Sequence, residues 1–296
     1  MHLIAYVNGK FQSLHNAMIH IEDRGFQFAD GVYEVVACYQ DNFIEMGAHL
    51  QRLEQSCQKI NIELPASLCE IRNLIERAYR FNRIPNAMIY VQVTRGMAPR
   101  THAYPETIQP SLIITVRPLP EVSQEKLAVG YRAITLEDIR WKHCDIKSIA
   151  LLPSIMGKHE AQSRGADECF WVDEEKHVLE GSSTNIFAIK GSEDLAEIFK
   201  SNKKEQTHIL LTHPLGSRIL GGITRDLVIR SARKLGMTIE ERPWSLEENG
   251  ITECFVSSTT NAAMPVYSVD DNSVGTGKPG PVTTQIRQLV LNEFYA

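Results

Sequence analysis

Two prolines within the run RPLPE, at residues 117–121, constrain this chain more than any other feature. Each proline fixes its own φ angle and lacks a backbone N–H, so the run forms a stiff connector between regular elements. The chain has 296 residues, a length that suits about two domains. We therefore predict a small N-terminal domain over residues 1–117, an interdomain linker over 118–125 and a C-terminal domain over 126–296.

The N-terminal part shows both strand and helix patterns. Asn8-Gly9 predicts a hairpin, because both turn positions need positive φ and these residues tolerate it. Ser67 and Glu70 form a capping box that begins a helix. Alternating apolar residues predict strands at 31–39, 87–96 and 111–118, and apolar residues at helical spacing predict a helix at 47–60.

The C-terminal part has a similar mixture, which makes α+β the expected fold class. Strands are predicted at 127–136, near Lys147, and at the runs DECFWVD, NIFAIK, HILLTHP and ECFVSSTT. Helices are predicted at 154–164, at 227–235 and from about residue 282. The charged stretch Gly191 to Gln206 is expected to be a surface insertion.

Composition narrows the classes of partner. The net charge is −5, so no basic excess is available to neutralise nucleic-acid phosphates, and small molecules are the expected partners. The six cysteines are scattered singly without metal-ligand spacing, which predicts reduced thiols and no metal site. The N-terminus lacks a signal-peptide core, and no apolar run approaches the roughly 20 residues of a membrane helix. A cytoplasmic location is therefore expected.

Lys147 is the strongest candidate for a chemical role. It is the last basic residue of the run EDIRWKHCDIKS and stands in an apolar stretch, which favours the neutral, nucleophilic amine. The alternative is a surface lysine whose stem lies along the protein while its charge stays in water. Gly221 and Gly222, placed before a helix, allow an anion site or a plain turn.

Seven runs, in order over nearly the whole chain, together resemble the fold-type IV pyridoxal-phosphate enzymes, and among them the D-amino-acid aminotransferases. They are DRGFQFADGVYEVV, HLQRL, VTRGMAPRTHAYP, EDIRWKHCDIKS, EGSSTNIF, LTHP followed by GGITRD, and FVSSTTNAAMPV. The resemblance implies a two-domain enzyme like the branched-chain aminotransferases, with a smaller N-terminal α/β lobe and a larger, β-barrel-like C-terminal lobe with helices. It also implies a homodimer with its active sites at the subunit interface.

The resemblance further implies residues that hold pyridoxal 5′-phosphate. Lys147 would be the Schiff-base lysine and would move the proton between the substrate Cα and the cofactor C4′. Glu180 would face the pyridine nitrogen and keep it protonated. The remaining cofactor residues implied are Arg52, Ile223, Thr224, Ser258 and Thr259 for the phosphate, and Ser182 and Ser183 along the cofactor. Taken alone, Arg52 would be a solvated helix residue.

The resemblance assigns the substrate carboxylate to Tyr33, Arg100 and His102, with the arginine and histidine reaching in from the partner's loop. Alone, these would be a core tyrosine and two exposed loop residues. The implied reaction is a ping-pong transamination between a D-amino acid of the D-alanine or D-glutamate type and a 2-oxo acid. A branched-chain L-amino-acid aminotransferase and an aminodeoxychorismate lyase of the same fold are the alternatives, and neither is expected to carry Arg100 and His102.

The chain departs from the pattern expected for this family at three places. Lys142-His143 stands where an aliphatic residue followed by arginine is usual, the stretch 191–206 is inserted, and the rim at residues 215–218 differs. None of these departures changes an assigned cofactor residue, but the rim leaves the preferred substrate side chain open.

Overall fold

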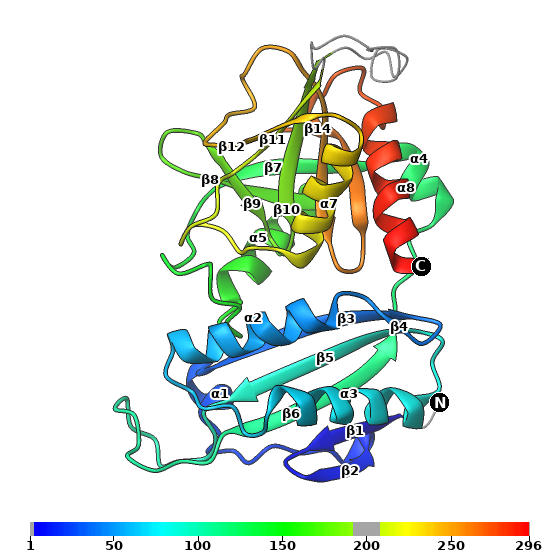
Figure 1. Cartoon of the computed structure of the whole chain (residues 1–296). Helices are drawn as coiled ribbons and strands as arrows, with labels where there is room; N and C mark the ends of the chain where they lie inside the picture. The colour runs from blue at the N-terminus through cyan, green and yellow to red at the C-terminus, as the bar shows by residue number, and fades with distance from the viewer. Residues whose placement is uncertain (1–2, 192–207, 296) are drawn as a thin grey trace. The chain divides into compact units, whose positions relative to one another are not determined.

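The chain divides into two compact units, drawn in Figure 1. The structure is a computed structural model that describes residues 3–191 and 208–295. The first unit is Met1–Pro120 with Ile146–Leu151, and the second is Glu121–Asp145 with Leu152–Ala296. The expected insertion at 191–206 lies outside the described residues from position 192 onward.

The segment Ile146–Leu151 was expected in the C-terminal domain over 126–296, but it lies with the first unit. Ser148 forms an isolated bridge with Val32, and the Ile149 N–H donates to the Gly31 carbonyl over 3.1 Å. These long-range backbone hydrogen bonds fix the segment that carries Lys147 to the first unit.

A six-stranded sheet forms the first unit, in the order β2-β1-β6-β5-β3-β4. Its strands are β1 (Ile4–Val7), β2 (Lys10–Ser13), β3 (Gly31–Tyr39), β4 (Asn42–Phe43), β5 (Asn86–Thr94) and β6 (Ser111–Pro118). A 3-10 turn η1 (Leu14–Asn16) and a short helix α1 (Arg24–Phe28) precede β3. The predicted hairpin is confirmed, since Val7 pairs with Lys10 and both turn residues have positive φ.

Two helices, α2 (Met46–Lys59) and α3 (Leu68–Asn82), pack on one face of this sheet. Their apolar stripes share one core with β3, β5 and β6, to which Leu53, Ile71 and Ile75 contribute side chains with no exposed surface. The predicted capping box of α3 is confirmed, because Ser67 Oγ accepts from the Glu70 N–H and the Glu70 carboxylate accepts from the Ser67 N–H. The strands and helices of this unit thus follow their sequence patterns closely.

A closed ring of six strands forms the centre of the second unit. The ring runs β10-β13-β14-β7-β8-β9 and closes where β9 pairs with β10. Its strands are β7 (Tyr131–Glu137), β8 (Glu168–Val172), β9 (Val178–Gly181), β10 (Asn185–Gly191), β13 (Ile251–Ser258) and β14 (Ala262–Val269). The strands β11 (His208–Thr212), β12 (Thr238–Glu241) and β15 (Asn272–Ser273) extend it. The expected β-barrel-like lobe is confirmed.

Helices pack around this ring: α4 (Gln124–Val129), α5 (Leu152–Ser163), α7 (Ile223–Lys234) and α8 (Pro281–Tyr295). Helices α7 and α8 lie side by side, as the yellow and red ribbons of Figure 1 show. Within residues 3–191 and 208–295, no helix combines the length and apolar character needed to cross a membrane.

Of the predicted strands of the second half, one was partly wrong and one was wrong: residues 131–136 of the strand expected at 127–136 do form β7. The first part of the strand expected at 127–136 is helix α4, because Ser123 Oγ caps it by accepting from the Lys126 N–H, and Gly130, with φ of 84°, ends it. The strand expected near Lys147 is a single bridge to β3. Local alternation could not distinguish these cases, because a cap and a tertiary contact decide them.

Candidate active site

Lys147 lies against Tyr33 in the first unit. The Lys147 carbonyl accepts from the Tyr33 N–H over 3.0 Å, and the Lys147 N–H donates to Ser56 Oγ over 3.3 Å. The Lys147 Nζ lies 4.4 Å from the centre of the Tyr33 ring, which stacks on Tyr90 with 5.5 Å between ring centres. Burial, reinforced by Tyr33, raises the pKa of Tyr90 to about 12. The amine is therefore carried on a backbone fixed at both its N–H and its carbonyl.

Arg52 belongs to a buried polar cluster with Glu34 and His49. Arg52 donates to both Glu34 oxygens, from Nε over 2.6 Å and from Nη2 over 2.8 Å. His49 Nδ1 lies 2.7 Å from Glu34 Oε2. Burial alone raises the pKa of Glu34, but Arg52 and then His49 outweigh it, and the pKa falls to about 2. Burial lowers the pKa of His49. The cluster is an ionised Glu34 held by Arg52 and by a largely uncharged His49.

Of these three residues, only Arg52 was predicted from the sequence; Glu34 and His49 were not. A signal was present: Glu34 stands between Val32 and Val36 on the face of β3 that is otherwise apolar, and His49 and Arg52 flank the apolar stripe of α2. A carboxylate on a buried strand face requires a charged or hydrogen-bonding partner. That partner is Arg52, the cation expected at the cofactor phosphate.

Arg100 and His102 lie on an exposed loop of the first unit and share one aromatic neighbour. The Arg100 guanidinium is 4.8 Å from the centre of the Phe28 ring. The His102 ring meets the Phe28 ring edge-on, with 5.6 Å between centres. Tyr33 lies instead with Lys147, so within the described residues of one chain the three carboxylate-binding candidates form two groups. From the resemblance, this loop is expected to bind the substrate carboxylate in the active site of the partner subunit.

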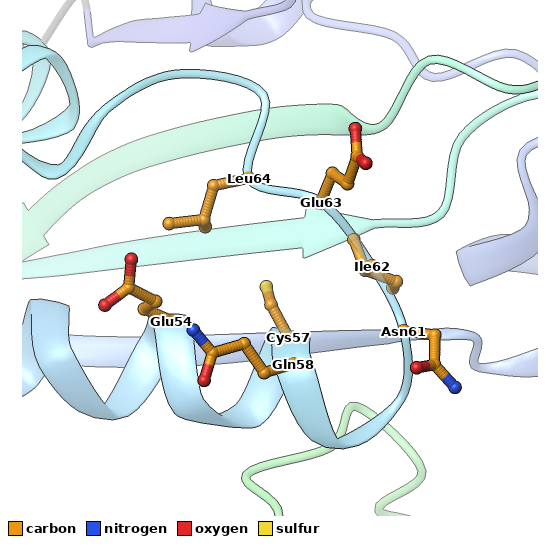
Figure 2. Close-up of a pocket in the computed structure, with 7 residues that line it drawn as sticks. All are labelled: Glu54, Cys57, Gln58, Asn61, Ile62, Glu63 and Leu64. Atoms are coloured by element: carbon orange, nitrogen blue, oxygen red, sulfur yellow. The ribbon is translucent and has the colours of Figure 1, made fainter.

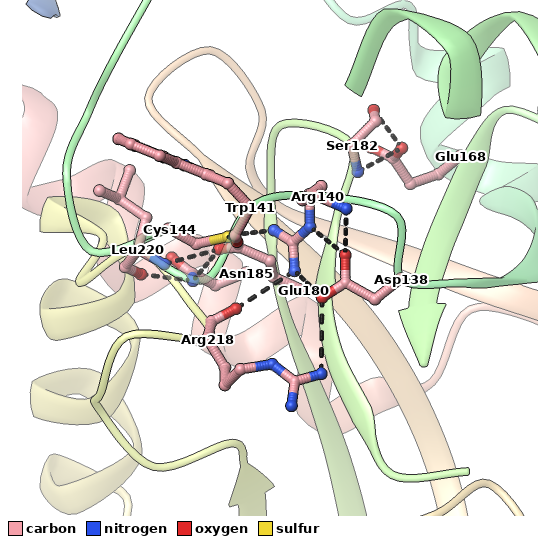
Figure 3. A network of polar contacts seen from close by, with 10 residues as sticks. All are labelled: Asp138, Arg140, Trp141, Cys144, Glu168, Glu180, Ser182, Asn185, Arg218 and Leu220. Atoms are coloured by element: carbon pink, nitrogen blue, oxygen red, sulfur yellow. Dashed lines mark hydrogen bonds and ion pairs between the residues drawn. The ribbon is translucent and has the colours of Figure 1, made fainter. Parts of the chain in front are cut away.

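Glu180 is held in an ionic network of the second unit, shown in Figure 3. It is 8% exposed, ion-paired with Arg140 Nη1, and accepts from the Leu220 N–H over 2.9 Å. Arg140 also donates from Nε to Asp138 over 2.8 Å. Burial alone lowers the pKa of Arg140, but Glu180 and Asp138 raise it above its ordinary value. Glu180 is thus a strand residue paired with a guanidinium. Its partner Arg140, which stands in the same run as Lys147, was not predicted from the sequence.

Asn185 connects Glu180 with the two other predicted cofactor segments of the second unit. Asn185 lies on β10, between its two neighbouring strands. It pairs with Glu180 on β9 and with Ser257 on β13, and Ser257 is followed by Ser258 and Thr259. Its Nδ2 donates to the Leu220 carbonyl over 2.8 Å, and a Cβ on Gly222 would lie 2.1 Å from its Oδ1. The start of α7, with Ile223 and Thr224, therefore lies beside the end of β13. Gly222 is required there because no side chain fits.

The predicted serines following Glu180 lie in different surroundings. Ser182 is 8% exposed, and both its hydroxyl and its backbone N–H donate to the buried carboxylate of Glu168. Ser183 is exposed. Figure 3 shows the Ser182–Glu168 pair apart from the network around Arg140. The Ser182 hydroxyl is committed to Glu168, so its assignment as a cofactor residue stays a prediction that the geometry does not strengthen.

Two of the departures from the family pattern lie beside each other. The Cys144 N–H donates to the Ser217 carbonyl over 2.8 Å, and Arg140 Nη2 donates to the Arg218 carbonyl over 3.2 Å. The ring of His143 meets that of Trp141 edge-on at 5.5 Å. The altered Lys142-His143 pair and the altered rim at 215–218 therefore belong to one surface of the second unit.

A separate pocket of about 510 Å³ opens at the end of α2. Figure 2 shows its lining residues, Glu54, Cys57, Gln58, Asn61, Ile62, Glu63 and Leu64, none of which is a predicted site residue. Burial raises the pKa of the Cys57 thiol to about 12, so it is not a nucleophile at neutral pH. The pocket offers no chemistry that matches the predicted reaction.

Comparison with known proteins identifies the family. The family model for amino-transferase class IV matches residues 31–269. D-alanine aminotransferases of Bacillus licheniformis and Listeria monocytogenes are 34% identical over 290 residues and 36% over 292, each covering 97% of this chain and 95% of the relative. The solved branched-chain amino acid aminotransferase of Escherichia coli is 25% identical with a TM-score of 0.87, covering 99% of this chain and 95% of that one.

A hypothetical aminotransferase from Mycobacterium tuberculosis, solved in its PLP-bound form, has the same fold at 19% identity and a TM-score of 0.81, and the match covers 98% of each chain. The predicted fold class and the predicted enzyme family are confirmed. Because the family match spans most of its length and the D-alanine aminotransferases exceed 30% identity over nearly the whole sequence, the chain belongs to the class IV aminotransferases.

Proposed function

We propose that this chain transfers an amino group between a D-amino acid and a 2-oxo acid. Class IV aminotransferases depend on pyridoxal 5′-phosphate, whose protonated ring accepts the electrons left when the substrate Cα loses its proton. The similarity to D-alanine aminotransferases over 97% of the chain carries the choice of D-amino acids. The intact run Arg100-Thr101-His102 supports it.

The residues of the second unit fit the charges of the cofactor. Glu180 is an ionised carboxylate whose pairing with Arg140 fixes it in place, and such a group keeps a pyridine nitrogen protonated. The α7 N-terminus at Ile223-Thr224 offers backbone N–H groups that a helix leaves unpaired in its first turn, and these suit a phosphate. The hydroxyls of Ser258 and Thr259 stand at the adjoining strand end. These hydrogen-bond donors suit the cofactor phosphate, and Glu180 suits its protonated pyridine ring.

The residues of the first unit supply the reacting amine and a fixed cation. We propose that Lys147 Nζ would hold the cofactor through its aldehyde and, once the substrate amine has displaced it, would move the proton at the substrate Cα. Tyr33, whose ring centre is 4.4 Å away, limits where the amine points. Arg52 is proposed to bind the phosphate. Its Nε and Nη2 donate to the Glu34 carboxylate, which fixes the orientation of the guanidinium. Tyr33, with Arg100 and His102 of a second copy, would bind the substrate carboxylate.

A homodimer is part of this proposal, and an exposed apolar patch supports it. Met18, Ile21, Phe26 and Met97 are 55–78% exposed, and the bridge between Asp23 and Met97 brings the two segments together. An exposed apolar patch of this kind marks an interaction surface. It adjoins the loop with Arg100 and His102, as expected for a loop that serves a second copy. A cytoplasmic location is also proposed, in keeping with the six free cysteines.

The central test is substrate choice. Purified protein with pyridoxal 5′-phosphate is incubated with 2-oxoglutarate and either D-alanine, L-valine or L-leucine, and the oxo acid formed is measured. Pyruvate from D-alanine is the expected product. Activity with only the L-amino acids would support the branched-chain alternative, which the Escherichia coli structural likeness favours. No oxo acid from any of these amino acids would support the lyase alternative, because none of them carries a leaving group that elimination could expel.

The role of Lys147 is tested by spectroscopy. Lys147→Ala should remove the visible absorbance of the lysine-bound cofactor, because no amine would remain to bind the aldehyde. Lys10→Ala, an exposed lysine of the same unit, is the matched control and should keep the band. A retained band in Lys147→Ala would show that another lysine is the ligand.

A further inference from the structure

We propose that Arg24, Asp30 and Arg95 form a loop clamp that positions Arg100 and His102, which makes the clamp residues positioning residues for substrate-carboxylate binding. The inference rests on the proposed function, because Arg100 and His102 are assigned to the carboxylate there. The clamp itself consists of contacts within the first unit.

The clamp joins two guanidinium groups through one carboxylate. Asp30 Oδ2 accepts from Arg24 Nε and from Arg95 Nε, each over 2.8 Å, and Asp30 Oδ1 accepts from Arg95 Nη2 over 3.0 Å. The side chains of Arg24, Arg95 and Asp30 are 3%, 4% and 11% exposed. Charge-assisted bonds at such low exposure are strong and geometrically specific. The three clamp residues therefore form a rigid support for the loop.

Both arginines reach from this support to the loop. Arg24 Nη1 donates to the Thr101 carbonyl over 2.6 Å, and Thr101 is the residue between Arg100 and His102. The Arg95 guanidinium lies 3.6 Å from the centre of the Tyr104 ring, two residues beyond His102. The clamp thus touches the loop between the two carboxylate candidates and just after them.

The base of the loop is also closed. The Arg24 N–H donates to the Gly96 carbonyl over 2.8 Å. Gly96 has φ of 102°, and a Cβ there would lie 2.0 Å from the Gln109 carbonyl oxygen. The two ends of the loop therefore approach each other so closely that only glycine fits. What remains to be fixed is the exposed part that carries Arg100 and His102.

Phe28 completes the connection at the end of α1. The guanidinium groups of Arg24 and Arg100 are each 4.8 Å from the centre of its ring, and the His102 ring meets it edge-on at 5.6 Å. One aromatic ring therefore contacts the clamp and both carboxylate candidates. Displacing a positioned group by about 1 Å can cost about a hundredfold in rate, so this placement matters beyond stability.

The test uses Arg24→Lys, which keeps the buried charge but loses the fork that bonds Asp30 and Thr101 together. Arg80→Lys, at an arginine whose side chain is 72% exposed in the same unit, is the matched control. Hydrogen exchange of residues 97–104 reports the loop directly, and steady-state kinetics on the holoenzyme report the site. We expect faster loop exchange and a KM for D-alanine raised about tenfold, with cofactor absorbance and saturating kcat retained.

In a background that lacks both carboxylate candidates, Arg100→Ala with His102→Ala, adding Arg24→Lys should raise KM no further, because the clamp acts through these two residues. Wild-type exchange or an unchanged KM in Arg24→Lys, alongside a raised KM in Arg100→Ala, would overturn the clamp proposal. An unchanged KM in Arg100→Ala would overturn the proposed function instead. Should Arg24→Lys fail to fold, Arg95→Lys takes its place, since Arg95 holds the same Asp30 carboxylate, and it must give the same loop exchange and KM changes.

Discussion

Replacing Glu34 by glutamine should destabilise the first unit in a way that depends on pH. Glu34 is 1% exposed and accepts two hydrogen bonds from Arg52, and His49 Nδ1 lies 2.7 Å from its Oε2. Breaking a buried ion pair by removing one charge costs about 3–5 kcal/mol. Glu34→Gln leaves the Arg52 charge without its carboxylate and should fall in this range.

The pKa of Glu34 gives a second estimate of the stability that its charge contributes. A fall from 4.5 to about 2 on folding corresponds to about 3 kcal/mol of stability. Because the folded pKa is depressed, this stability is fully present above pH 4.5 and is lost as the pH falls towards about 2. His49, whose pKa is also lowered, loses its contribution in the same direction, as acid charges it.

Hydrogen exchange of β3 and α2 as a function of urea measures the free energy of opening for this unit alone, at pH 7 and at pH 3. Wild type should lose stability between the two pH values, while Glu34→Gln should start lower and lose less. The control Glu76→Gln removes a surface ion pair with Arg80 and should change stability by about 0.5 kcal/mol or less. If Glu34→Gln stays within about 1 kcal/mol of wild type, or keeps the same acid dependence, the cluster does not carry this energy.

Three further substitutions test other parts of the structure. Gly157→Ala should destabilise the second unit by about 1–3 kcal/mol in urea denaturation, because a Cβ would lie 2.5 Å from the Trp171 ring; full stability would show that the ring moves aside. Glu180→Gln should lower kcat about a hundredfold with cofactor still bound, because a neutral amide would not keep the pyridine nitrogen protonated, and an unchanged kcat would remove Glu180 from the reaction. Ser67→Ala should cost about 1 kcal/mol, read as faster amide exchange at the start of α3, and unchanged exchange would contradict the cap.

Elements with local signals were predictable from the sequence. The Asn8-Gly9 turn needs only residues that tolerate positive φ, and the capping box at Ser67 needs only residues three apart in the chain. The order of the motif runs was enough to indicate the fold-type IV family, which the class IV match confirms. Local alternation began the strand expected at 127–136 too early, because Ser123 and Gly130 set a short helix over its first residues, before β7 begins at Tyr131.

The candidate site depends far more on partners that are distant in sequence. Periodicity placed Arg52 beside an apolar stripe, but only the fold of β3 against α2 shows Glu34 holding its fork. Arg140 stands forty residues from Glu180 in sequence, and the ring of strands brings the two together. Spacing along the chain carries no information about such pairs, since they form only when the sheet closes.

The sequence by itself determined the turns, the caps and the family, because each depends on residue type at short range or on motif order. The same motif order predicts Lys147 as the reacting lysine. Only the tertiary structure decided that Lys147 lies with the first unit, on a segment bridged to Val32. It also decided that Asp30 couples two arginines to the loop of Arg100. Burial removes water from these charged groups, so their partners must come from wherever the folded chain supplies them.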